Sequence, residues 1–164
     1  MIPYLASVLF AVLTHEAAHL TVMRVLGVKT ERMRLGGFGI AIEAKYGLAS
    51  YLKQATVSLS GSACNIISAH LLSAHGELSA ACLAYGLFNL LPLSMLDGGE
   101  LLDIILAVCG TTDRVRRIVH VAADTALMVA IWIFAVYLAL NGVGEGLLIS
   151  SLYMVFSRLF NRRT

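Results

Sequence analysis

Charged residues are scarce in this chain of 164 residues, and Asp, Glu, Lys and Arg together make up only 13% of it. Soluble domains usually contain roughly 25% of these residues. Hydrophobic residues make up 59%, and the mean hydropathy is +0.82. This composition excludes an ordinary soluble domain and predicts an integral membrane protein. The net charge of +2 is also too small to indicate a nucleic-acid partner.

Cysteine is sparse as well. Cys64, Cys82 and Cys109 lie in apolar segments without paired spacing, so neither a disulfide framework nor a cysteine zinc site is indicated. We interpret all three as small packing residues. A cleavable signal peptide is not expected, because no positive charge precedes the first apolar run. Since no repeat or linker divides the sequence, we expect one domain over residues 1–164.

Long apolar runs are the main feature that is present. A helix needs about 20 residues to cross a hydrocarbon core of about 30 Å. Five runs approach or exceed that length, at residues 2–23, 51–74, 78–108, 118–140 and 146–160. The third run is too long for one simple helix and is broken between Pro92 and Gly99, which predicts two half-helices joined by an irregular turn. The expected fold is therefore an all-α polytopic membrane protein with about five transmembrane helices.

The basic residues all fall on one side of this layout. The 12 Lys and Arg residues lie between the first and second runs or at the start of the second (Lys53), between the third and fourth, and at the C-terminal end. The connections on the opposite side contain none. By the positive-inside rule, the N-terminus lies outside the cell and the C-terminus lies in the cytoplasm.

Residues 29–44 have a shorter alternation of apolar and polar side chains, with Gly36 and Gly37 as a turn signal. This pattern predicts a small β-hairpin associated with the membrane surface. An ordinary amphipathic loop is the alternative interpretation of the same residues.

The first apolar run contains the sequence His15-Glu16-Ala17-Ala18-His19. Residues four apart lie on one face of a helix, so His15 and His19 can bind one Zn²⁺ while Glu16 acts as a general base toward a water molecule. A carboxylate near the centre of a span costs roughly 2.5–3.5 kcal/mol on insertion scales, so it rarely occurs there without a partner or a task. The alternatives are a chance pattern and histidines that only pack in a core.

A catalytic zinc site usually has a third protein ligand. The acids and other histidines within the apolar runs are Asp97, Glu100, Asp103, Asp124, His70 and His120. Asp97 stands out because Pro92 before it and Gly98 after it break the helix around its carboxylate. Glu100 or Asp103 could support the site from the following half-helix, and we interpret the other three as pairing or packing residues.

These motifs resemble the site-2 protease family of intramembrane zinc metalloproteases. That family combines an HExxH helix with a distant N-x-x-P-x-x-x-x-D-G segment, which is matched here by Asn89, Pro92 and Asp97 at the same spacing. A third family motif, G-P-x-x-N, is approximated at residues 61–65, where Ser62 replaces the proline and Asn65 is kept. The likeness covers residues 1–110, the expected core, and leaves residues 111–164 as a two-span extension.

The glycine-rich stretch from Gly36 to Ala41, the absence of an inserted PDZ domain and the short extension look most like one subgroup of this family. It is the sporulation subgroup typified by stage IV sporulation protein FB, which cleaves an inactive sigma-factor precursor. The resemblance therefore implies a bacterial cell membrane and a membrane-associated protein substrate. A regulatory membrane protein is a candidate second partner.

The resemblance also implies roles for individual residues. His15, His19 and Asp97 would hold Zn²⁺, although this ligand set also accepts other divalent metals. Glu16 would accept a proton from the attacking water and deliver it to the leaving amine. Asn65 would donate to the oxyanion or position the substrate, and the alternative for it is a hydrogen bond between packed helices.

The hairpin is a candidate substrate contact. A transmembrane helix hides its peptide bonds in internal hydrogen bonds, so it must unwind before it is cut. An unwound segment could add to the edge of the hairpin as an extra strand, with contacts at Gly37, Phe38, Gly39 and Ile40.

The expected function is peptide-bond hydrolysis near the cytoplasmic side of the membrane. One alternative is a catalytically inert scaffold or binding protein of the same fold, although such chains usually lose a ligand or the glutamate. The other is a small metal transporter, in which polar ligands would recur along several spans. The acids and histidines of this chain do not form such a series.

Overall fold

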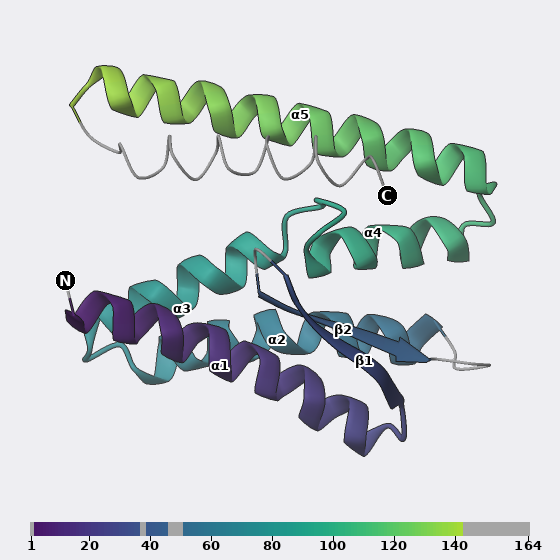
Figure 1. Cartoon of the computed structure of the whole chain (residues 1–164), viewed down its shortest axis with the longest axis horizontal. Helices are drawn as coiled ribbons and strands as arrows, with labels where there is room; N and C mark the ends of the chain where they lie inside the picture. Colours follow the sequence, from purple (N-terminus) through teal and green to yellow (C-terminus); the bar gives the residue numbers. More distant parts are fainter. Residues whose placement is uncertain (1, 37–38, 46–50, 143–164) are drawn as a thin grey trace. The chain divides into compact units, whose positions relative to one another are not determined.

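The computed structural model describes residues 2–36, 39–45 and 51–142 (Figure 1). The chain divides into two compact units, residues 1–116 and 117–164. The described elements are, in chain order, α1 (Ile2–Val25), β1 (Lys29–Gly36), β2 (Gly39–Lys45), α2 (Tyr51–Leu71), α3 (Gly76–Asn89), α4 (Asp97–Val108) and α5 (Asp113–Leu140).

The helix α1 continues through the HExxH motif and ends two residues beyond the expected limit. Gly27 terminates it by adopting a positive φ of 69°. The N–H of Val28 then donates to the carbonyl of Met23 at 2.8 Å, which satisfies one of the last carbonyls of the helix. Arg24 in the last turn places a positive charge where the helix dipole favours one.

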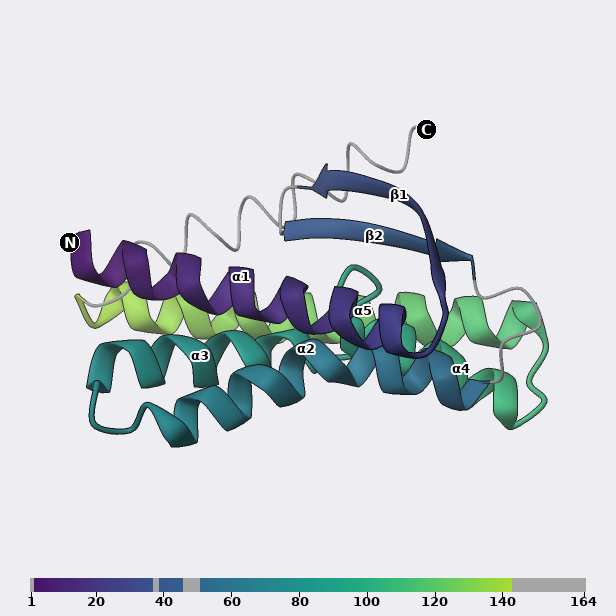
Figure 2. The same ribbon diagram turned by 90° about the horizontal axis from the view of Figure 1, so that it is seen from below.

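In the first unit, α1, α2 and α3 pack against one another, and α2 also contacts α4 (Figure 2). Their core includes a cluster of small residues, Ala11, Ala69 and Cys82, which lets the helices approach closely. The interpretation of cysteine as a packing residue thus holds for Cys82, which is 0% exposed. It is wrong for Cys109, which is exposed.

The strands β1 and β2 pair antiparallel, from Lys29 opposite Lys45 to Gly36 opposite Gly39. They occupy the segment that the sequence suggested as a hairpin. Gly37 and Phe38, two of the expected substrate contacts, lie outside the described residues. The association of the hairpin with the membrane surface stays a prediction.

The third apolar run forms two short helices, α3 with 14 residues and α4 with 12. Residues 90–96 connect them, because Pro92 has no N–H to continue a helix. The expected turn was placed too far along the chain, since Asp97 and Gly98 already belong to the first turn of α4. A Cβ at Gly98 would lie 2.2 Å from the carbonyl oxygen of Leu90, so the helix start packs directly on the connection.

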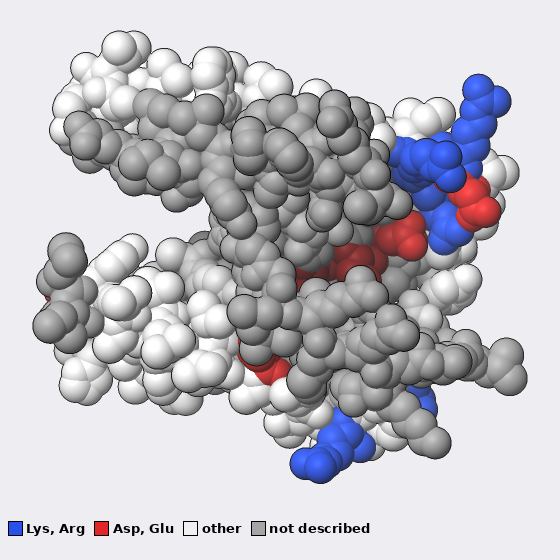
Figure 3. Space-filling model, viewed as in Figure 1, with Lys and Arg blue, Asp and Glu red and all other residues white. Residues whose placement is uncertain are grey.

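Two of the described helices are long and apolar enough to cross a membrane, over Tyr4–Val25 and Asp113–Leu140. The total of five spans stays a prediction, and the expected span at 146–160 lies outside the described residues. The helix α5 begins five residues before the expected limit of 118, so the basic residues from Arg114 to Arg117 lie in its first turns and not in a loop. On the face shown in Figure 3, Lys and Arg gather near the end of α1 and the start of α5.

Candidate metal centre

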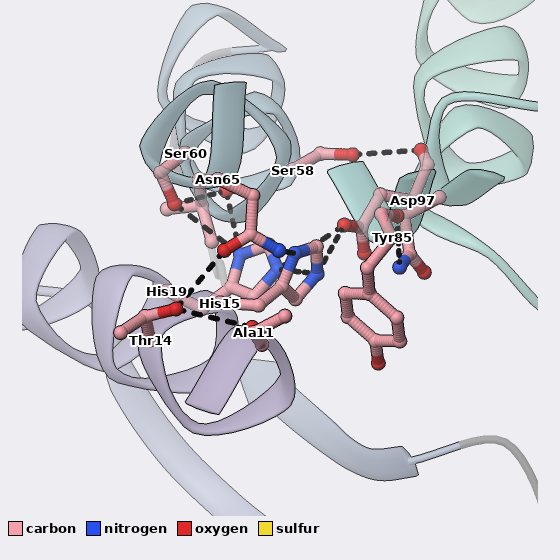
Figure 4. A network of polar contacts seen from close by, with 11 residues as sticks. Ala11, Thr14, His15, His19, Ser58, Ser60, Asn65, Tyr85 and Asp97 are labelled. Carbon is pink, nitrogen blue, oxygen red and sulfur yellow. Dashed lines mark hydrogen bonds and ion pairs between the residues drawn. The ribbon is translucent and has the colours of Figure 1, made fainter. Parts of the chain in front are cut away.

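Two histidines of α1 and one aspartate of α4 bring their side chains to one point (Figure 4). His15 Nε2 lies 2.9 Å from Asp97 Oδ2, and His19 Nε2 lies 3.2 Å from the same oxygen. The two Nε2 atoms are 3.0 Å apart. The spacing of four residues places both rings on one face of α1, as the sequence predicted.

The cluster is shielded from solvent. His15 is 2% exposed and His19 is 7% exposed, while the side chain of Asp97 retains 21%. Burying polar groups among apolar helices is unfavourable unless they have partners. Here the three side chains are partners for one another, which is the arrangement that a bound cation would further stabilise.

The donor set fits zinc. Bonds of 2.0–2.1 Å in a tetrahedral site place neighbouring ligand atoms about 3.3 Å apart. The three measured separations, 2.9, 3.0 and 3.2 Å, are close to this value. Among the described residues, His15, His19 and Asp97 are the group of potential metal ligands whose atoms converge, within 4.8 Å of one another.

The helix α2 fixes the orientation of the His19 ring. His19 Nδ1 lies 2.8 Å from the carbonyl oxygen of Val57 and 3.2 Å from Ser60 Oγ. Ser60 Oγ donates its own proton to the same carbonyl at 2.6 Å. A proton on Nδ1 is therefore favoured, and Nε2 keeps its lone pair for a metal.

Gly61 lies directly beside the ligand atoms. A Cβ at this position would be 2.4 Å from His19 Nε2 and 2.7 Å from His15 Nε2. The backbone of α2 thus passes so close to the site that only glycine fits there. Ser62, where the family motif has proline, leaves α2 as one continuous helix.

Asn65 is the next residue along this face of α2 and is 0% exposed. Its Oδ1 accepts a hydrogen bond from Thr14 Oγ1 at 3.0 Å, and its Nδ2 lies 3.5 Å from His15 Nδ1. The alternative role expected for Asn65, a hydrogen bond between packed helices, is therefore observed. Asn65 also contacts the candidate ligand His15. On its other side, the His15 ring meets Tyr85 of α3 edge to face at 5.2 Å.

Asp97 is held through its backbone. Ser58 Oγ donates to the carbonyl oxygen of Asp97 at 2.8 Å, which ties the start of α4 to α2. A carboxylate in the first turn also lies near the positive end of the helix dipole. The role of Ser58 was not foreseen, although Ser58, Gly61, Ser62 and Asn65 form a buried stripe of small and polar residues at helical spacing.

Other acids and histidines lie outside this cluster. Asp103, considered as a support for the site, forms an ion pair with Arg116 at 3.7 Å. Glu100 and His70 are exposed. Asp124 belongs to the second unit and is 3% exposed. Glu16, the expected base, follows His15 in α1 and is 8% exposed.

The helices and the site together indicate a membrane protein with three residues placed so that they could hold a metal ion. Neither a family model nor a curated protein matches the chain. Among solved structures, it is similar to a site-2 protease from Methanocaldococcus jannaschii, with a TM-score of 0.71 and 22% sequence identity. The likeness covers 92% of this chain and 73% of the other. The chain therefore has the fold of a site-2 protease.

Proposed function

We propose that this protein is an intramembrane zinc metalloprotease of the site-2 type. It cleaves a membrane-associated or transmembrane protein near the cytoplasmic side of the bilayer. The observation that carries this proposal is the convergence of His15, His19 and Asp97 between apolar helices of a site-2 protease fold.

His15 and His19 hold the metal from α1, and Asp97 holds it from α4. When bound, zinc polarises the scissile carbonyl and makes an attacking water more acidic. Glu16, which follows His15 in the same helix, would accept the proton of that water and deliver it to the leaving amine. The low exposure of the cluster limits access of bulk water to the reacting bond.

The hairpin captures the substrate. Because β1 pairs only with β2 in the described residues, each strand has an outer edge on which an unwound segment can add by main-chain hydrogen bonds. Gly37, Phe38, Gly39 and Ile40 are the proposed contacts. Gly39 and Ile40 begin β2, and Gly37 and Phe38 precede them in the sequence.

The orientation is proposed from the sequence. The positions of the Lys and Arg residues favour an N-terminus outside and a C-terminus in the cytoplasm. The glycine-rich sequence from Gly36 to Ala41 favours a bacterial protease of the sporulation subgroup, with a sigma-factor precursor as substrate and a regulatory membrane protein as a second partner.

Cleavage of a model substrate tests this function. The full chain in detergent is incubated with a labelled transmembrane peptide that carries a helix-breaking Asn-Pro pair in its cytoplasmic half, and products are identified by mass spectrometry. Wild type should cut the peptide, and a Glu16→Gln variant should lose at least about 100-fold in rate. The variant should keep its zinc, because Glu16 is not a ligand.

A chelator supplies the control for metal dependence. 1,10-Phenanthroline should stop cleavage by wild type, and added zinc should restore it. Undiminished cleavage by Glu16→Gln would contradict the mechanism. Wild type that holds zinc but cuts no transmembrane peptide would favour an inert scaffold of the same fold.

A further inference from the structure

Asn65 joins two residues of α1 through one carboxamide. Oδ1 accepts from Thr14 at 3.0 Å, and Nδ2 lies 3.5 Å from Nδ1 of His15, the adjacent residue (Figure 4). The side chain is 0% exposed and bridges α1 and α2. Asn65 faces Nδ1 of His15, the ring nitrogen that does not point at Asp97. It therefore influences which of the two ring nitrogens carries the proton.

A neutral histidine that binds a metal through Nε2 carries its proton on Nδ1, and that proton needs an acceptor. For His19 the acceptor is the carbonyl oxygen of Val57. For His15 the group that the described residues offer to Nδ1 is the carboxamide of Asn65. As the amide is oriented in the structure, it presents nitrogen to Nδ1, which favours a proton on Nε2, where it is donated to Asp97 at 2.9 Å.

A half-turn of the amide reverses this preference. Rotation about Cβ–Cγ exchanges Oδ1 and Nδ2 at nearly the same positions. Oδ1 then accepts from Nδ1 of His15, and Nδ2 donates to Thr14 Oγ1. Thr14 can accept this bond because its own proton has two other acceptors, the carbonyl oxygens of Phe10 at 2.9 Å and Ala11 at 3.1 Å.

We propose that Asn65, oriented by Thr14, is a positioning residue that selects the metal-binding tautomer of His15. With its carboxamide turned, Asn65 would give Nδ1–H of His15 the acceptor that a metal-binding Nε2 requires. This inference rests on the proposed zinc site. It differs from the role of oxyanion donor, because Asn65 acts through His15 and does not touch the substrate.

Zinc affinity tests the proposal without any substrate. The full chain is purified in detergent, and the zinc dissociation constant is measured by competition with a chromophoric chelator. Asn65→Leu keeps the branched shape of the side chain but removes the acceptor, and should weaken zinc binding about 10- to 100-fold. Asn65→Asp keeps an acceptor oxygen beside Nδ1, and should bind zinc within about threefold of wild type.

Thr14→Val removes the group that orients the amide, and should weaken binding by about two- to tenfold. Thr21→Val is the matched control. Thr21 Oγ1 makes the same kind of bond within α1, to the carbonyl oxygen of Ala17 at 2.7 Å, but is exposed. The control should bind zinc like wild type.

The outcomes separate this inference from the proposed function. Wild-type affinity in Asn65→Leu, or equal losses in Asn65→Asp and Asn65→Leu, would overturn the tautomer role alone. Should Asn65→Leu fail to fold, a tenfold loss of zinc affinity in Asn65→Asp would also overturn the tautomer role. Wild-type zinc affinity in Thr14→Val would overturn it as well. An oxyanion donor predicts that Asn65→Asp stops cleavage while zinc affinity is unchanged in both variants. Wild type that binds no zinc would overturn the proposed function and this inference together.

Discussion

Gly61 of α2 and His19 of α1 approach so closely that a Cβ at Gly61 would lie 2.4 Å from Nε2. Real Cβ atoms do not come this near to another heavy atom, so a side chain here would displace the ring. The Nε2 atoms of His15 and His19, which point at Asp97, both lie within 2.7 Å of where this Cβ would be. The candidate metal centre therefore packs directly against the backbone of α2, and its geometry depends on a residue that has no side chain.

Replacing Gly61 with alanine should push His15 and His19 away from Asp97. We expect Gly61→Ala to lose zinc binding by more than about tenfold, because a ligand set must be held close to its ideal geometry. Gly76→Ala is the control, since a Cβ at Gly76 meets nothing within 4 Å. Equal zinc content in the two variants would contradict the close contact.

Removing the carboxylate of Asp97 should leave two histidine ligands. We expect about one zinc per chain in wild type by elemental analysis, and little or none in Asp97→Ala, because a structural or catalytic zinc site needs at least three protein ligands. Asp103→Ala removes a carboxylate six residues further along the same helix, where it pairs with Arg116. The Asp103→Ala variant should keep its zinc. Loss of zinc from this variant would show that Asp97 is not the specific ligand.

The start of α4 should be intolerant of any side chain at Gly99. A Cβ there would lie 2.1 Å from the carbonyl oxygen of Leu93, which is backbone and cannot move aside freely. Gly99→Ala should therefore lower the free energy of unfolding by about 1–3 kcal/mol or more. Thermal unfolding in detergent measures the effect, and an unchanged melting temperature would contradict the tight packing.

The buried and exposed cysteines should respond differently to serine. Cys82 is 0% exposed in an apolar cluster, so Cys82→Ser places a hydroxyl there at a cost of about 1–3 kcal/mol. Cys109 is exposed, so Cys109→Ser should leave the melting temperature nearly unchanged. Similar melting temperatures for the two variants would argue against the packing of α3 on α1 and α2.

Helical spacing was enough to predict the local part of the site. A helix places residues four apart on one face, so His15 and His19 had to lie side by side once α1 formed. The break between α3 and α4 was also predictable, because proline cannot continue a helix. The break was predicted too far along the chain, since Asp97 and Gly98 belong to α4. The backbone at the start of α4 packs on residues 90–96.

The surroundings of these candidate ligands depend on how the helices pack against one another. Asp97 is 78 residues from His19, and their 3.2 Å contact depends on how α4 is tied to α2 through Ser58. Helical spacing does not reveal that Gly61 passes beside the ring nitrogens or that Asn65 faces Nδ1 of His15, because both depend on the distance between two packed helices. The three candidate ligands could be predicted from local spacing and motif, whereas the residues that orient them follow from contacts between segments far apart in the chain.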